Sequence, residues 1–195
     1  MSAAEREKWD ARYRDGAYED RTHPTALLAE WLPRLPRGRA LDVACGAGRN
    51  ALYLAANGYA VTALDISRTA LDRAQTAAAE RGLTVEWLCV DLDEDPERVL
   101  PAGGFDLIVW VRYVHSTLMP HLMARLAVGG AIVCEQHFAT GAPVAGPRSA
   151  EFRLPPGALR RSAQGLRVAH AYEGPVVDPD GRPVALTQLI GSNPA

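Results

Sequence analysis

The sequence predicts an α/β fold: a doubly wound, mostly parallel seven-stranded sheet that ends in a carboxyl-terminal antiparallel hairpin. Strand-like and helix-like segments alternate from residue 39 to residue 136 with short connections, the order that gives a parallel sheet with helices on both faces. Residues 105–111 are almost wholly apolar, as in a strand buried on both faces. After residue 139 the alternation stops, and two strand-like segments flank Asp178-Pro179-Asp180-Gly181, a typical turn sequence.

Each element follows from a local pattern. The five strands of the alternating part are expected over residues 39–43, 59–64, 84–90, 105–111 and 131–136. Helices are expected over residues 49–57, 67–81 and 115–127, where apolar residues recur at helical spacing. Gly58 and Gly82 end the first two helices, and Ser67 caps the second. Residues 166–172 and 184–190 form the closing antiparallel pair.

Length and composition fit a single domain over residues 1–195. The chain is 48% hydrophobic and 23% charged, and its net charge of -2 gives no reason to expect a nucleic acid partner. The sequence contains neither a signal-like start nor an apolar stretch of membrane-spanning length, so we expect a cytoplasmic protein without a membrane partner. Its three cysteines have no zinc or disulfide spacing, and no metal is expected.

Two segments outside the alternating pattern are expected to enclose a ligand. Residues 1–37 are interpreted as a helical lid, because Trp9 and Tyr13 are four residues apart and share one face of a helix. A small packing helix is the alternative. Pro24 is expected at the first position of a second helix. Residues 139–160, rich in glycine and proline, are expected to form a substrate-side loop.

The main functional motif is the stretch from Leu41 to Asn50, in which an apolar strand ends on an acid and breaks into a glycine turn before a helix. Gly46 and Gly48 let the backbone approach a nucleotide-type cofactor closely. Asp42 would repel a pyrophosphate there, whereas it would attract the sulfonium and ammonium groups of S-adenosylmethionine. The motif therefore favours S-adenosylmethionine as cofactor.

Two further acids follow the next two strands. Asp65, after the second strand, is placed where a carboxylate accepts hydrogen bonds from ribose hydroxyls, and Asp91-Leu92, after the third, can meet an adenine ring. Helix capping is the alternative role of each aspartate. An NAD-dependent oxidoreductase also stays open, because residues 46–51 satisfy Gly-x-Gly-x-x-Gly/Ala. A non-catalytic S-adenosylmethionine-binding module is the third possibility.

The stretch 41–65, together with Tyr13, Arg21-Thr22-His23 and Val90-Asp91-Leu92, resembles the class I S-adenosylmethionine-dependent methyltransferases, and among them the TehB-like branch named for tellurite resistance. The resemblance covers nearly the full chain and implies in-line methyl transfer to a small-molecule acceptor. It implies the following cofactor-binding residues: Tyr13, His23, Asp42, Ala44, Cys45, Gly46, Gly48, Asn50, Asp65, Ile66, Asp91 and Leu92.

Two departures from the family pattern concern the cofactor loop and the acceptor. Ala44 stands where the class commonly has glycine. Tellurite-type proteins carry a basic His-Arg pair before the last hairpin turn, where this chain reads Pro175-Val176-Val177-Asp178. The loss of that positive charge argues against tellurite or selenite as acceptor.

Candidates for acting on the acceptor follow the fourth and fifth strands. His137 is the preferred general base, Arg112 is expected to orient an acidic group, and Tyr113 lies beside it. Arg112 has the alternative role of bracing Asp42 or the lid. A base is needed only for an acceptor that is protonated at neutral pH. The identity of the acceptor and the oligomeric state are not predicted.

Overall fold

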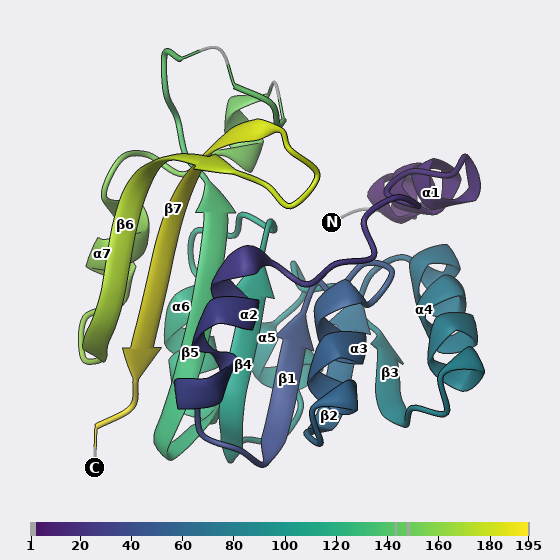
Figure 1. Ribbon diagram of the computed structural model, residues 1–195, viewed down its shortest axis with the longest axis horizontal. Coiled ribbons are helices and arrows are strands. Elements are labelled where there is room, and N and C mark those ends of the chain that lie inside the picture. The colour runs from purple at the N-terminus through teal and green to yellow at the C-terminus, as the bar shows by residue number, and fades with distance from the viewer. Residues whose placement is uncertain (1–2, 143, 148, 195) are drawn as a thin grey trace.

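A computed structural model describes residues 3–142, 144–147 and 149–194. Its middle layer is a seven-stranded sheet with the strand order β3-β2-β1-β4-β5-β7-β6 (Figure 1). The strands are β1 (Arg39–Val43), β2 (Ala60–Asp65), β3 (Val85–Cys89), β4 (Phe105–Val111), β5 (Leu126–His137), β6 (Arg167–Val177) and β7 (Pro183–Ser192). Strands β1 to β5 are parallel, and β7 runs antiparallel to both β5 and β6. The predicted fold class is confirmed.

Helices cover both faces of the sheet. They are α1 (Ala3–Arg14), α2 (Ala26–Trp31), α3 (Arg49–Ala56), α4 (Arg68–Glu80), α5 (Pro96–Val99), α6 (Leu118–Arg125) and α7 (Ala158–Ser162), with 3-10 turns η1 (Leu32–Arg34) and η2 (Ala150–Phe152). Helices α2, α3 and α4 lie on the near face in Figure 1, and α5, α6 and α7 lie behind the sheet.

Strand alternation gives each face its own core. In β4, Leu107 and Val109 pack with α2 and α3, whereas Ile108 and Trp110 pack with α6 and α7. All four side chains are buried, as expected for a central parallel strand. The predicted burial of residues 105–111 on both faces is therefore confirmed.

The region around α6 differs from the prediction. The helix expected over residues 115–127 spans only Leu118–Arg125, and β5 begins at Leu126 rather than at residue 131. Gly130 lies inside β5, where a Cβ atom would stand 2.7 Å from the Phe105 carbonyl oxygen. Glycine there allows close approach to β4 beside a register shift between Phe105 and Leu107.

The amino-terminal region also differs in detail. Helix α2 begins at Ala26 with Thr25 as its N-cap, so Pro24 precedes the cap instead of occupying the first helical position. The expected lid (1–37) and loop (139–160) include positions 1, 2, 143 and 148, and the expected domain ends at position 195; these five positions lie outside the described residues. No described helix is long and apolar enough to cross a bilayer.

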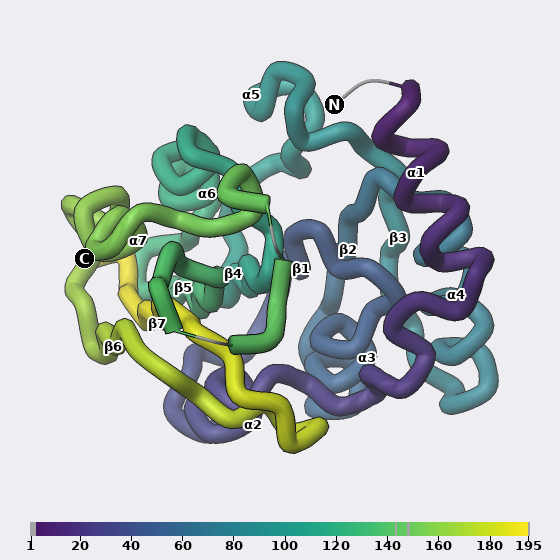
Figure 2. Tube along the Cα trace, turned by 90° about the horizontal axis from the view of Figure 1, so that it is seen from above, coloured from purple at the N-terminus to yellow at the C-terminus, as the bar shows by residue number. Residues whose placement is uncertain are grey.

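The sheet order reverses between β1 and β4, the place where doubly wound sheets bind ligands. Figure 2 shows this edge from above, with α1 along α4 on one side and the β6–β7 hairpin reaching over the other. Apart from Tyr13 and His23, which precede β1, the predicted site residues lie at or shortly after the carboxyl ends of β1 to β5. The fold therefore gathers them at one edge.

Candidate functional site

The turn after β1 has a backbone that demands small residues. Ala44, Gly46 and Gly48 have positive φ values of 55°, 56° and 78°. A Cβ atom on Gly46 would collide with the Tyr13 hydroxyl, and one on Gly48 would lie 2.9 Å from Trp87. Ala44 adopts a conformation that costs an L-residue about 1–2 kcal/mol, which explains why glycine is common at that position.

Asp65 connects the glycine turn to the end of β2. Its Oδ2 accepts a hydrogen bond from the Gly46 amide at 2.8 Å, and its Oδ1 accepts one from the Ser67 amide at 2.9 Å. Burial nevertheless raises its pKa. Each carboxylate oxygen has a second lone pair, so Asp65 can hold the turn and still accept ribose hydroxyls.

Asp42, at the end of β1, is 1% exposed and has an unsatisfied oxygen. Its Oδ2 has no hydrogen-bond partner among the described residues. Burial raises the pKa of this carboxyl to about 7, and the Ala51 amide and Arg49 only partly oppose the shift. A buried carboxylate oxygen of this kind is suited to a ligand cation, so the residues present fit the ammonium group of S-adenosylmethionine.

Arg49, the first residue of α3, is a mostly buried cation without a described partner. Burial, followed by the proximity of Arg112, lowers its pKa. Within the described ranges its guanidinium makes neither a hydrogen bond nor an ion pair, and the charges of Glu135 and Asp178 only partly oppose the fall in its pKa. It lines a cavity of about 20 Å³ together with Asp20, Arg21, His23, Asp178, Pro179 and Asp180. Sequence reasoning missed Arg49, although a charged residue directly after a glycine turn was the available signal.

The side of the site after β3 is open. Asp91, Leu92 and Ile66 are buried, and Asp91 Oδ1 accepts a hydrogen bond from the Asp93 amide at 3.0 Å. A cavity of about 550 Å³ lies beside them and is lined by Asp93, Glu94, Pro96, Val114, His115, Ser116, Thr117, His121 and Glu151. Its size suits a nucleoside-sized group.

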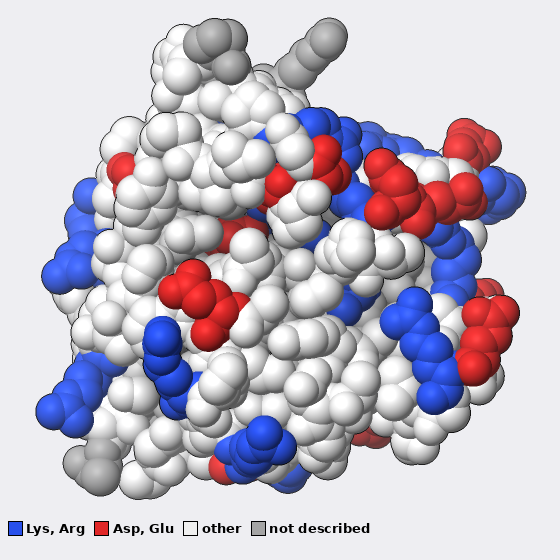
Figure 3. All heavy atoms as spheres, in the orientation of Figure 1, with Lys and Arg blue, Asp and Glu red and all other residues white. Residues whose placement is uncertain are grey.

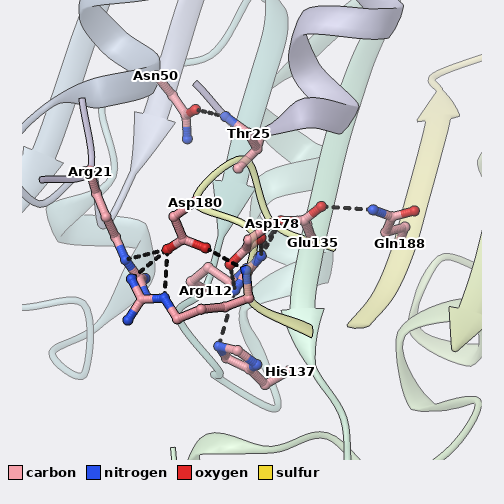
Figure 4. A network of polar contacts seen from close by, with 10 residues as sticks. Arg21, Thr25, Asn50, Arg112, Glu135, His137, Asp178, Asp180 and Gln188 are labelled. Carbon is pink, nitrogen blue, oxygen red and sulfur yellow. Dashed lines mark hydrogen bonds and ion pairs between the residues drawn. The ribbon is translucent and has the colours of Figure 1, made fainter. Parts of the chain in front are cut away.

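Arg112 is the centre of a buried charge network at the ends of β4 and β5 (Figure 4). Its Nη2 donates to Glu135 Oε1 at 2.9 Å and to Asp178 Oδ1 at 2.7 Å. Glu135 Oε2 in turn accepts from Gln188 Nε2 at 2.8 Å. The three charged side chains are at most 12% exposed. Arg112 also has a positive φ of 60°, a strained conformation that aims its side chain across the sheet edge.

His137 joins this network as an acceptor. Its Nε2 lies 3.3 Å from Arg112 Nη1, and because a guanidinium has no lone pair, Nε2 must accept. A Cβ atom on Gly146 would stand 2.9 Å from the imidazole, so the loop after β5 packs against the ring. Burial and the Arg112 charge lower the His137 pKa to about 3. The imidazole is therefore neutral, and the lone pair on its Nε2 already accepts the hydrogen bond from Arg112.

The structure brings Arg112 and His137 together but gives Tyr113 different neighbours. The Tyr113 hydroxyl donates to Asp93 Oδ1 at 3.0 Å, beside the larger cavity. Burial raises the Tyr113 pKa.

Asn50, one of the predicted cofactor residues, has a structural contact. Its Oδ1 accepts a hydrogen bond from the Thr25 amide at 3.0 Å and joins α3 to the start of α2. Cys45 is buried next to the glycine turn.

Helix α1 is held against the start of α4. Asp10 Oδ1 accepts from Ser67 Oγ at 2.6 Å and from the Thr69 amide at 3.0 Å. Arg73 of α4 donates to the Tyr13 carbonyl at 3.2 Å. Trp9 and Tyr13 stack with ring centroids 6.4 Å apart, as their spacing predicted. Tyr13 thereby covers Gly46.

The segment after α1 also meets the β6–β7 turn from the other side. Arg21 Nε lies 3.9 Å from Asp180 Oδ2, and Arg182 Nη2 lies 3.9 Å from Asp20 Oδ2. Both pairs join residues far apart in the chain, and Asp20, Arg21 and Asp180 line the small cavity together with Arg49 and His23. Figure 4 shows Arg21 directed at Asp180. Among the described residues, no group of three or more His, Cys, Asp or Glu side chains could hold a metal ion.

Comparison with known proteins agrees with this geometry. Residues 40–128, from β1 to the start of β5, match the family described as "Methyltransferase domain". Trans-aconitate 2-methyltransferase of Klebsiella pneumoniae is 32% identical over 124 residues, which are 60% of this chain and 46% of that protein. The matched part thus spans less than half of that curated relative.

Solved structures show the same fold over nearly the whole chain. TehB from Haemophilus influenzae superposes with a TM-score of 0.73 at 18% identity, covering 93% of this chain and 66% of that one. The 1,6-didemethyltoxoflavin-N1-methyltransferase of Burkholderia thailandensis, with bound substrate and S-adenosylhomocysteine, gives 0.72 at 16% identity, covering 99% and 88%.

Residues 40–128 match the methyltransferase domain family, and the sheet order and the glycine turn are those expected of a class I S-adenosylmethionine-dependent methyltransferase. The chain as a whole has the fold of TehB, in agreement with the resemblance seen in its sequence.

Proposed function

We propose that this protein binds S-adenosylmethionine across the glycine turn and transfers its methyl group to a small-molecule acceptor. The observation that carries the proposal is the pair of unsatisfied charges beside that turn, the Asp42 carboxylate and the Arg49 guanidinium. The amino-acid end of the cofactor carries an ammonium and a carboxylate. Asp42 would take the ammonium and Arg49 the carboxylate, and each buried charge would then have a partner.

The remaining predicted cofactor residues fit the same orientation. Asp65 would accept the ribose hydroxyls, and Ile66, Asp91 and Leu92 would hold adenine beside the larger cavity. Tyr13 and helix α1 would cover the cofactor, as the predicted lid does. The bound cofactor supplies an electrophilic methyl group, so the protein needs to orient the acceptor and exclude water. Residues 139–160 would form the acceptor side.

Isothermal calorimetry tests the proposal with S-adenosylhomocysteine and with methylthioadenosine, which lacks the amino-acid end. We expect the first to bind the wild type and Asp65→Ala to weaken it about tenfold or more. Arg49→Gln should weaken S-adenosylhomocysteine but leave methylthioadenosine unchanged. Arg68→Gln is the matched control, because Arg68 is an exposed arginine on α4. Failure of the wild type to bind S-adenosylhomocysteine would overturn the proposal.

The two other interpretations make different predictions in the same experiments. A nicotinamide cofactor would bring a pyrophosphate near the buried Asp42 carboxylate, and tight NADH binding in place of S-adenosylhomocysteine would support it. A non-catalytic module would bind S-adenosylhomocysteine but transfer no methyl group to any acceptor tested.

We also place the protein in the cytoplasm, without a nucleic acid partner. Cys45, Cys89 and Cys134 are free thiols, as in a reducing compartment. On the face seen in Figure 3, basic and acidic side chains of the described residues are interspersed rather than gathered by sign. Nucleic acid binding would favour a concentrated basic surface.

A further inference from the structure

We propose that the acceptor is a small carboxylic acid that is methylated on a carboxylate oxygen, and that it binds Arg112 in the place occupied by the Asp178 carboxylate. This inference rests on the proposed function and names the substrate class of the same site.

The two carboxylates on Arg112 are held in different ways. Glu135 belongs to β5, opposite Gln188 in the sheet register, and its second oxygen is bound by that residue. Asp178 belongs to the turn between β6 and β7, whose residues 179–182 are all exposed. Two ion pairs of 3.9 Å, to Arg21 and Asp20, hold this turn against the segment after α1, so its displacement would break only long contacts besides that of Asp178. Arg112 would keep both of its hydrogen bonds to Glu135, at 3.0 and 2.9 Å.

Asp178 contacts Arg112 as a bound carboxylate would. Its Oδ1 lies 2.7 Å from Arg112 Nη2 and its Oδ2 lies 3.4 Å from Nη1, so one carboxylate spans two guanidinium nitrogens. This is the geometry by which arginine recognises carboxylate ligands. Asp178 also lines the small cavity, which has only about 20 Å³ left. If an acceptor carboxylate took the place of the Asp178 carboxylate, Arg112 would keep a partner of the same chemistry and the cavity would become larger.

The surroundings favour an anion once Asp178 has left. Arg21 and Arg112 lie near enough to Arg49 to lower its pKa. The charges of Arg112 and Arg153 likewise lower the pKa of His137. Of the acids that stay in place, Glu135 is already paired with Arg112, and Asp20 lines the small cavity 3.9 Å from Arg182. A neutral or cationic acceptor would leave this cluster of arginines without compensation.

The same end of the site lacks a free base among the described residues. Nε2 of His137 is occupied by Arg112 and its Nδ1 is buried without a partner, while the Tyr113 hydroxyl donates to Asp93. An acceptor that must lose a proton would gain nothing from these groups. A carboxylate is already ionised at neutral pH. Its oxygen would form the new bond to the methyl carbon as the carbon–sulfur bond breaks; sulfur keeps that electron pair, and no proton moves.

The product type gives a direct test with methyl-tritiated S-adenosylmethionine. The acceptors are succinate, citrate and benzoate, each beside its amide. Methyl esters release volatile methanol in alkali, whereas N-, S- and C-methyl products do not. We expect alkali-labile label from at least one of the acids and from none of the amides. Absence of such label from every acid, or alkali-stable label from any of these acceptors, overturns the inference.

Variants of the turn test the displacement. Asp178→Asn should lower the KM of the responding acid by about threefold to tenfold, because a neutral amide competes less for Arg112. Asp180→Asn alters the same turn without touching Arg112 and should change that KM by less than about twofold. An unchanged or higher KM in Asp178→Asn, or an equal gain in Asp180→Asn, contradicts displacement at Arg112.

Binding of S-adenosylhomocysteine separates the two possible failures. If wild type and Asp178→Asn both bind it while no acid gives alkali-labile label, the acceptor class is wrong and the proposed function stands. If the wild type does not bind it, the proposed function itself fails.

Discussion

The proposed cofactor side and the proposed acceptor side of the site are built from different kinds of contact. Around β1 and β2, Asp65 accepts from the backbone amides of Gly46 and Ser67, 19 and 2 residues away. Around β4 and β5, Arg112 binds the side chains of Glu135 and Asp178, 23 and 66 residues away. Main-chain contacts shape the first half, whereas long-range ion pairs shape the second.

The two kinds of contact respond differently to substitution. Positive φ values at the glycine turn favour residues without a bulky side chain, so few substitutions are tolerated there. An ion-pair network can be changed by one substitution in a surface turn, such as the turn that carries Asp178. Three substitutions sharpen the comparison.

The largest effect is expected from breaking the acceptor-side network. Arg112→Gln leaves the buried carboxylates of Glu135 and Asp178 without their cation, and we expect a loss of about 3–5 kcal/mol in the free energy of unfolding by urea titration. The double variant Arg112→Gln with Glu135→Gln should recover part of that loss. A loss below about 1 kcal/mol for the single variant would show that the network is not a buried unit.

A medium effect is expected on the cofactor side and depends on pH. The folded-state pKa of Asp42 is raised to about 7 from 3.8, so its contribution to stability is present below pH 3.8 and is lost as the pH rises through 7. Asp42→Asn should therefore be more stable than wild type at pH 8, relative to pH 5, by on the order of 2 kcal/mol.

Thermal unfolding of the ligand-free protein at both pH values checks this prediction, with exposed Asp72→Asn as control. The same Asp42→Asn variant should bind S-adenosylhomocysteine more weakly. A variant with the wild-type pH dependence would show that Asp42 ionises normally in the folded protein.

The smallest effect is expected at the anchor of α1. Asp10→Ala removes an acceptor for Ser67 Oγ and the Thr69 amide at the start of α4, and should cost about 1 kcal/mol. Hydrogen exchange should rise in α1 more than in α4, because α4 keeps its own Ser67 cap. Asp15→Ala, beyond the end of α1, is the control. Equal hydrogen exchange of α1 in Asp10→Ala and in Asp15→Ala would show that Asp10 does not hold α1 in place.

Much of the fold was predictable because it follows from local patterns. The alternation of apolar segments predicted β1 to β5, and the turn sequence at residues 178–181 predicted the β6–β7 pair. Gly58 and Ser67 marked helix ends correctly. The extent of β5 was missed, since Leu126 pairs with Phe105 through a register shift that only the neighbouring strand determines. Arg49 was missed because its lack of a partner depends on the surroundings, whereas residue type alone is visible in a sequence.

By itself, the sequence determined the order of the elements, the glycine turn and the acids that follow the strands, and these favour S-adenosylmethionine as the cofactor. These features depend on backbone preferences over a few neighbouring residues. Only the tertiary structure decided which charges meet: Arg112 with Glu135 and Asp178, and Arg49 with none of the described residues. The physical reason is that ion pairing depends on distance in space, which the register of β4, β5 and β7 sets.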